Sequence, residues 1–339
     1  MSRGAGVTSN TVPWEILRAA GYSPRLLEQE PGPTPFAERF MEGVFEPRFR
    51  TIFDRLCAGA WNDLDLVVIP RTSEQEHKLY LYLREASRQH FSDAIPRIYL
   101  YDLLHTRTSE SYTYGLQRTR QMVRDFEVSC QALHEAISES NRARNAIRQI
   151  EQKRNDGLLE GSAAVELIRE FYTTNRSLFA DRAPAKLQKL CAPVPAHYPR
   201  ILIKGALLNS SDLHRLVEKG GACVIAEDHW LGSRAAGTTG INENVDPTTA
   251  IFEKYFYDEL SPRIQPSRER DAWFQREIAS GHIDGVLFYI PFDDDVEGWD
   301  YPRHRAWLDE QRLPSTVVRD ASDVPTIFMF IDQLSRNRK

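Results

Sequence analysis

Residues 200–234 read RILIKGALLNSSDLHRLVEKGGACVIAEDHWLGSR, and their pattern predicts a strand, a helix and a second strand. Residues 201–208 form a short apolar run, which is typical of a strand buried on both faces. Leucine and valine at 213, 216 and 217 then give one apolar helical face. Gly220 and Gly221 end that helix, and residues 222–226 form another buried strand. This order predicts a βαβ unit of a parallel sheet.

The second strand of this unit ends in three polar residues, Glu227, Asp228 and His229. In open α/β sheets, ligands bind beyond the carboxyl ends of the strands. We therefore take residues 227–234 as the first candidate site.

Composition and charge exclude several classes of protein. The chain has 339 residues, of which 41% are hydrophobic and 27% are charged, so it can bury a sizeable core. Its net charge of -5 argues against nucleic-acid binding driven by phosphate contacts. No apolar run approaches the roughly 20 residues that span a bilayer, and the N-terminus lacks an apolar signal core. We expect a soluble cytoplasmic protein with no membrane or nucleic-acid partner.

The four cysteines are Cys57, Cys130, Cys191 and Cys223, and none belongs to a CxxC pair. Cys130 falls on a predicted helix and Cys223 in a predicted strand, where cysteine behaves as a small apolar residue. The spacing predicts neither a disulfide framework nor a dedicated metal site.

Strand and helix patterns divide the chain into four segments. The first twelve residues look like a loose tail, and no strand is expected between 109 and 190. Alternation of strands with helices elsewhere predicts an α/β fold with two parallel-sheet lobes. The expected segments are an N-terminal helical segment (1–57), a first α/β lobe (58–110), a long helical segment packing on that lobe (111–197) and a second α/β lobe (198–339).

Several stretches together resemble the B/C-type subunits of 2-hydroxyacyl-CoA dehydratases and benzoyl-CoA reductases. No single motif decides this resemblance; the ordered set over about 320 residues does. The stretches are PWEILRAAGYSP, LDLVVIPRTSEQEHKLY, PRIYLYDLLH, RILIKGALL, GGACVIAEDHWLGSR, VDPTTAIFEKY, IDGVLFYIPFDDD and the C-terminal helix.

The resemblance implies a fold, a reaction class and partners. It implies two flavodoxin-like, that is Rossmann-like, lobes joined by a helical segment, and a homologous partner subunit. It also implies a [4Fe-4S] cluster between the lobes that contacts an acyl-CoA substrate. An ATP-dependent activator protein would deliver electrons to that cluster.

The chain departs from this family where the cluster ligands are expected. The resemblance places cysteines near Thr72 and Ser73, at Ser261, at Trp230 and at Asp293, and none is present. A cluster needs thiolate ligands, typically four. We therefore expect no cofactor in this chain and a [4Fe-4S] cluster in its partner subunit.

The retained polar residues of these loops are candidates for substrate binding. Arg234 could hold a phosphate or carboxylate with its planar guanidinium. Alternatively, Glu227 or Asp228 pairs with Arg234 and fixes the loop. The candidate substrate-binding residues are Thr72, Ser73, Asp228, Trp230, Arg234 and Asp293.

His229 and His77 follow strands in different lobes and are candidates for general acid–base catalysis, because imidazole titrates near neutral pH. A lone loop histidine is more often solvated or hydrogen-bonded. The acidic run at 293–295 could bind a divalent metal ion together with Asp228, His229 or His77, but such runs more often form turns and helix caps. We assign no metal ligand.

Three functions remain open. The chain could be a cluster-lacking subunit of a heteromeric dehydratase or reductase, where it shapes an acyl-CoA cleft and supports a cluster-bearing partner. It could be an enzyme of altered chemistry that uses one metal ion or acid–base groups at the former cluster site. It could also be a scaffold without catalysis.

Overall fold

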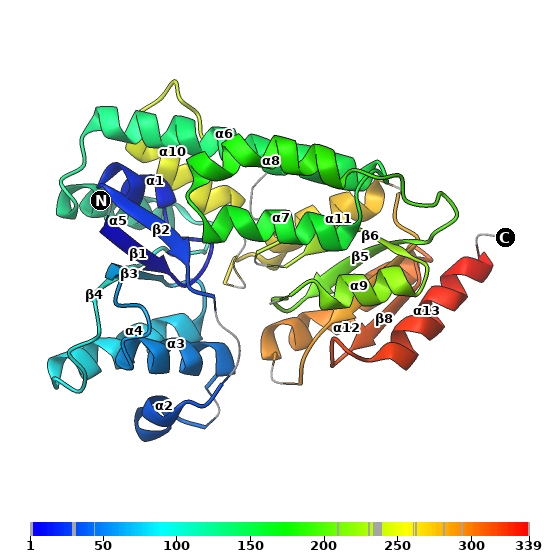
Figure 1. Ribbon diagram of the computed structural model, residues 1–339, viewed down its shortest axis with the longest axis horizontal. Helices are drawn as coiled ribbons and strands as arrows, with labels where there is room; N and C mark the ends of the chain where they lie inside the picture. Colours follow the sequence, from blue (N-terminus) through cyan, green and yellow to red (C-terminus); the bar gives the residue numbers. More distant parts are fainter. Residues whose placement is uncertain are drawn as a thin grey trace. The chain divides into compact units, whose positions relative to one another are not determined.

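The computed structural model contains two parallel β-sheets of four strands each, in two compact units (Figure 1). It describes residues 3–28, 32–43, 45–208, 210–229, 231–232, 239–259, 261, 263–280, 282–292 and 294–337. The predicted α/β fold with two parallel-sheet lobes is confirmed. Unit 1 comprises Met1–Arg142, Tyr172–Leu178 and Thr239–Pro266, and unit 2 comprises Ala143–Phe171, Phe179–Thr238 and Ser267–Lys339.

The sheet of unit 1 has the strand order β2-β1-β3-β4. Parallel strands in this order make a flavodoxin-like sheet, with a change of direction between β1 and β3. Its strands are β1 (Arg3–Val7), β2 (Tyr22–Leu26), β3 (Leu64–Pro70) and β4 (Arg97–Tyr101). The helices of this unit are α1 (Trp14–Ala19), α2 (Pro35–Phe40), α3 (Pro47–Cys57), α4 (Glu74–Arg88), α5 (Ser109–Asp125), α10 (Pro247–Glu253) and the π-helical turn η2 (Lys254–Asp258).

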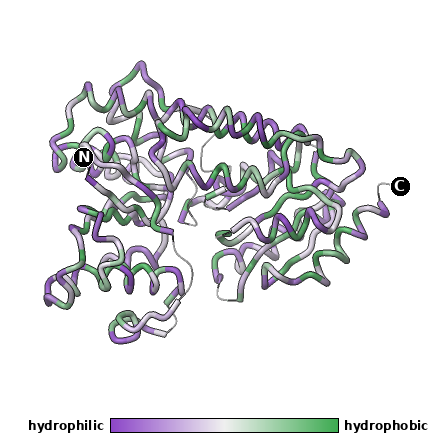
Figure 2. Tube along the Cα trace, in the orientation of Figure 1, coloured by the Kyte–Doolittle hydropathy of each residue, from purple (hydrophilic) through white to green (hydrophobic). Residues whose placement is uncertain are grey.

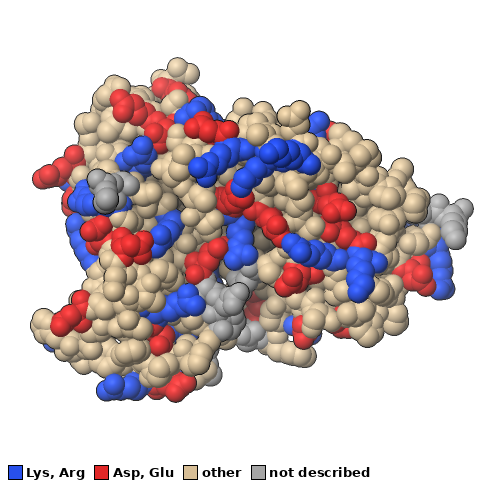
Figure 3. Space-filling model, viewed as in Figure 1, with Lys and Arg blue, Asp and Glu red and all other residues tan. Residues whose placement is uncertain are grey.

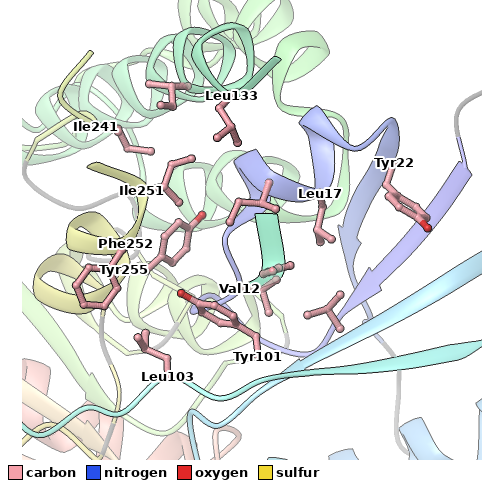
Figure 4. Packing of buried hydrophobic residues seen from close by; sticks show 14 of the residues in the cluster. Val12, Leu17, Tyr22, Tyr101, Leu103, Leu133, Ile241, Ile251, Phe252 and Tyr255 are labelled. Atoms are coloured by element: carbon pink, nitrogen blue, oxygen red, sulfur yellow. The ribbon is translucent and has the colours of Figure 1, made fainter. Parts of the chain in front are cut away.

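Helices cover both faces of this sheet because β3 is apolar on both sides. Leu66 and Val68 pack into a cluster with residues of α1, α5, α10 and α6 (Cys130–Asn155), while Val67 and Ile69 pack against α2, α3 and α4. Figure 4 shows the first cluster, in which Phe252 and Tyr255 lie among residues from several elements.

The loose tail expected over residues 1–12 is wrong, because β1 occupies Arg3–Val7 and pairs with both β2 and β3. Glycine is depleted in strands, so the two glycines of β1 gave this stretch no strand signal in the sequence. Gly4 is required there, because a Cβ atom would lie 2.2 Å from the Asp63 carbonyl oxygen. Strand β2 was also not expected; it contains Pro24, which a strand at the edge of a sheet tolerates.

Unit 2 repeats the arrangement with the strand order β6-β5-β7-β8. Its strands are β5 (Arg200–Gly205), β6 (Cys223–Asp228), β7 (Gly285–Tyr289) and β8 (Ser315–Val318). Ile201 and Ile203 face α9 and α13, whereas Leu202 faces α11 and α12. The helices that belong wholly to this unit are α9 (Asp212–Lys219), α11 (Ser267–Ala279), α12 (Asp295–Glu310) and α13 (Val324–Asn337).

The strand-free stretch expected between 109 and 190 is confirmed, since it holds only helices. Hydrophilic and hydrophobic residues alternate along the helices of the chain (Figure 2). Basic and acidic side chains are interspersed over the face drawn in Figure 3. Within the described residues, no helix combines the length and apolar character that crossing a membrane requires. The remaining helices are α6 (Cys130–Asn155), α7 (Gly161–Thr173) and α8 (Arg176–Leu190).

Candidate functional site

In unit 1, a group of buried hydroxyls occupies the carboxyl ends of β1 and β3. This is the position at which the strand order changes direction, where α/β sheets bind ligands. We call this group the hydroxyl network; its members, all at most 5% exposed, are Thr8, Ser9, Thr11, Thr72 and Ser261.

Thr72 is the centre of the hydroxyl network. Its hydroxyl lies 2.8 Å from that of Ser9 and also hydrogen-bonds the hydroxyl of Thr11. Ser261 donates from Oγ to the Thr72 carbonyl oxygen at 2.9 Å. The loop after β3 therefore contacts a residue 189 positions away in sequence. Every hydroxyl of the network has a polar neighbour, which offsets the cost of burial.

Two carboxylates border the hydroxyl network. Thr8 donates to Glu76 at 2.6 Å, and Asn10 donates from its amide to Glu259 at 3.1 Å. Burial raises the pKa of Glu76, although hydrogen bonds from Thr8 and the charge of Arg48 act in the opposite direction. Glu76 therefore holds a proton more readily than an exposed glutamate.

Ser73 and His77 lie beside this network on α4. Ser73 is the N-cap residue, and its hydroxyl accepts the backbone N–H of Glu76 at 3.1 Å. His77 is half-buried in the first turns of the helix. Thr72 and Ser73 are thus fixed by hydrogen bonds, and their role in substrate binding stays a prediction.

In unit 2, buried charges gather at the end of β6. Lys204 lies 2.7 Å from Asp228 and 3.9 Å from Glu297, which is in the first turn of α12. Burial raises the pKa of Glu297 to about 7, against the opposing effect of the Lys204 charge. The Lys204 ammonium therefore lies between two carboxyl groups, one of which titrates near neutral pH.

A second charged group in unit 2 surrounds Glu227, which is fully buried. One carboxylate oxygen contacts Nε2 of both His214 and His229, the latter at 3.4 Å, and the other accepts from Arg154 at 2.9 Å. Burial would raise the pKa of Glu227, but the charges of His214 and Arg154 outweigh it and hold the pKa well below its usual range. Glu227 is therefore an ionised carboxylate inside the protein.

These contacts place two of the unit 2 candidates. Asp228 pairs with Lys204 and His229 contacts Glu227, and both are 2% exposed. Trp230, Arg234 and Asp293 lie outside the described residues, and so does the expected pairing of Arg234 with Glu227 or Asp228.

His77 and His229 belong to different units, and their joint action in one cleft stays a prediction. Sequence reasoning missed Thr8 to Thr11, because that stretch was expected to be a tail. It also missed Lys204 and His214, whose polar side chains are buried by contacts distant in sequence.

A family model described as "2-hydroxyglutaryl-CoA dehydratase, D-component" matches residues 10–325. The chain belongs to this family. The β subunit of (R)-phenyllactyl-CoA dehydratase from Clostridium sporogenes is 23% identical over 130 residues, which cover 38% of this chain and 34% of that subunit. The aligned part thus spans about a third of that relative. The predicted resemblance to 2-hydroxyacyl-CoA dehydratase subunits is confirmed at the level of the family, and its benzoyl-CoA reductase part stays a prediction.

The four cysteines of this D-component family member lie in different elements. Cys57 is buried in an apolar cluster, where burial and the charge of Asp54 raise its thiol pKa to about 12. Cys223 is buried in β6 and contacts the Pro199 carbonyl oxygen at 3.5 Å. Cys130 begins α6 and Cys191 follows α8. Among the described residues, no three His, Cys, Asp or Glu side chains gather as a metal site.

Proposed function

We propose that this chain is a cluster-lacking subunit of a heteromeric 2-hydroxyacyl-CoA dehydratase or of a related acyl-CoA reductase. It would shape the acyl-CoA cleft and support a homologous partner that holds a [4Fe-4S] cluster. An ATP-dependent activator would deliver electrons to the cluster of that partner. The family match over residues 10–325 and the name of the related β subunit support this reaction class.

The observation that carries the cluster-lacking part of the proposal is the contact between Thr72 and Ser261. The resemblance places cluster cysteines at or beside both positions. Here Ser261 donates to the Thr72 carbonyl, and the Thr72 hydroxyl bonds to Ser9 and Thr11. Buried hydroxyls that hydrogen-bond to one another therefore stand where the resemblance implies thiolates, which supports the proposal. Hydroxyls are poor ligands for such clusters, which proteins bind through cysteine.

The test is to quantify iron and acid-labile sulfide in the chain purified anaerobically, alone and together with the homologous subunit. We expect less than about one iron per chain alone, and a cluster in the complex that depends on the cysteines of the homologous subunit. Dehydration of a 2-hydroxyacyl-CoA by the activated complex would support the reaction class.

Variants of the accessible cysteines serve as the control. Cys130→Ser and Cys191→Ser should leave the iron content of the complex unchanged. The proposal is wrong if the isolated chain binds a cluster that either substitution removes. A single metal ion in the isolated chain, lost in Asp293→Ala or His229→Ala along with activity, would instead support an enzyme of altered chemistry.

A further inference from the structure

Three segments of unit 1 that are distant in sequence each bring an arginine to the carboxyl edge of its sheet. Arg71 directly follows β3, and its guanidinium lies 3.5 Å from Asp102, which directly follows the neighbouring strand β4. Arg107 lies five residues after Asp102 in the sequence. Arg263 follows the turn η2.

Backbone pairing joins the second and third of these segments. Thr106 and Gln265 form a parallel β-bridge. The Arg107 N–H donates to the Gln265 carbonyl at 2.8 Å, and the Gln265 N–H donates to the His105 carbonyl at 3.3 Å. The Arg263 N–H donates to Ser261 Oγ at 3.2 Å, so this segment is also tied to the hydroxyl network. The arginines are therefore held on fixed backbone.

His105 is the buried centre of this group and is 3% exposed. Neither of its ring nitrogens makes a hydrogen bond of normal geometry with the described residues, although the Arg71 backbone lies close. Burial, together with the positive charges of Arg107, Arg263 and Arg71, lowers the pKa of His105 to about 3. The ring is therefore neutral near pH 7, and the Arg71 backbone is the polar neighbour of one of its nitrogens.

Asp102 and Glu74 offset the positive charges of Arg71 and Arg263 only in part. Asp102 accepts from the Tyr114 hydroxyl at 2.7 Å and is only a distant partner of Arg71 at 3.5 Å. Glu74 contacts Arg263 at 2.8 Å, but its side chain is 66% exposed, and such surface pairs contribute little. Neither of these two ion pairs is both short and buried.

Two guanidinium donors also lack an acceptor. The Nε of Arg71 and one terminal nitrogen of Arg263 are buried without a hydrogen-bond partner among the described residues. Unsatisfied buried donors are costly, and the cost is greater for charged groups. An anion that accepted from them would remove this cost and the mutual repulsion of the arginines.

We infer that Arg71, Arg107, Arg263 and His105, here called the arginine cluster, bind a phosphate group. The planar guanidinium matches the oxygens of a phosphate with two parallel hydrogen bonds. The cluster lies at the carboxyl ends of two adjacent strands, the edge at which parallel sheets bind ligands. This inference stands independently of the proposed function, because free pyrophosphate, a nucleotide and CoA all carry the group.

The first experiment is calorimetric titration of the full chain with inorganic pyrophosphate, AMP, CoA, 3′-dephospho-CoA and pantetheine. We expect at least one phosphate-bearing probe to bind and pantetheine, which has no phosphate, to bind at least about tenfold more weakly. Arg263→Gln and Arg71→Gln should each weaken binding of that probe by about tenfold or more. Arg268→Gln, at a side chain that is 83% exposed, is the matched control and should leave it unchanged.

The probes also separate this inference from the proposed function. Tight binding of pyrophosphate or AMP without preference for CoA supports the arginine cluster and counts against an acyl-CoA subunit. Preference for CoA over dephospho-CoA supports the cluster and identifies the 3′-phosphate as its ligand. Absence of binding by every phosphate-bearing probe overturns the inference.

A second measurement needs no variant and so does not depend on a variant's folding. Phenylglyoxal modifies accessible arginines, and peptide mass spectrometry reports each site. Saturating concentrations of the tightest phosphate-bearing probe should slow modification of Arg71, Arg107 and Arg263 several-fold and leave Arg268 unaffected. Equal modification of all four arginines with and without the probe overturns the inference.

Discussion

At the scale of single residues, Glu297 should make stability depend on pH in a defined direction. Its folded pKa of about 7 exceeds the usual 4.5, so the folded state binds the proton more tightly than the unfolded state. The stability that this proton contributes is present below pH 4.5 and is lost as pH rises to about 7. The free energy of unfolding of Glu297→Gln, compared with that of wild type, should therefore rise by up to about 1.4 kcal/mol for each pH unit across this window.

Urea unfolding at pH 4.5, 6 and 8 measures this difference. Glu310→Gln, at an exposed position at the end of the same helix, is the control and should follow wild type at every pH. A difference between Glu297→Gln and wild type that stays constant with pH would contradict the prediction.

The titration of His105 should make the protein less stable at low pH, which is the opposite of the effect of Glu297. Its pKa falls from 6.5 to about 3 on folding, so the unfolded state binds the proton more tightly. Its neutral ring therefore costs stability as pH falls below about 6.5, by about 1.4 kcal/mol for each unit until pH 3. His105→Gln should lose stability less steeply than wild type between pH 6 and 4. Chemical unfolding at several pH values checks this, and equal slopes would show that His105 titrates normally.

At the scale of elements, glycines decide whether a strand can form. Gly4→Ala should destabilise the protein by about 1–3 kcal/mol, because the new methyl group would collide with the Asp63 carbonyl across β1 and β3. Gly298→Ala is the matched control, since it meets open space inside α12 and should stabilise by about 0.5–1 kcal/mol. Thermal unfolding of both variants measures the effects, and equal effects would refute the steric argument.

The same chemistry explains which elements the sequence could predict. Strand β3 can be recognised from sequence, because LDLVVIP is mostly apolar and contains three consecutive β-branched residues. Strands β1 and β2 could not be found, because RGAGV and YSPRL carry glycine and proline and are stabilised by their pairing. Pairing is a long-range property, and local propensity does not contain it.

The candidate site was predictable to a similar extent. Thr72 and Ser73 were found through the family resemblance, which places a cluster cysteine in the loop that follows β3. Ser261 was noted only as a departure from the family, and its contact with Thr72 spans 189 positions. The arginine cluster depends on the bridge between Thr106 and Gln265, which no periodicity reveals.

At the scale of the whole molecule, each unit has its own sheet and its own apolar clusters, so we expect two unfolding transitions. Phe53 belongs to a cluster of unit 1 and Phe288 to a cluster of unit 2, and both are fully buried. Truncation of a buried phenylalanine costs about 3–5 kcal/mol. Differential scanning calorimetry should therefore show that Phe53→Ala lowers the midpoint of one transition and Phe288→Ala that of the other. A single transition that both variants lower equally would show instead that the two units unfold as one cooperative body.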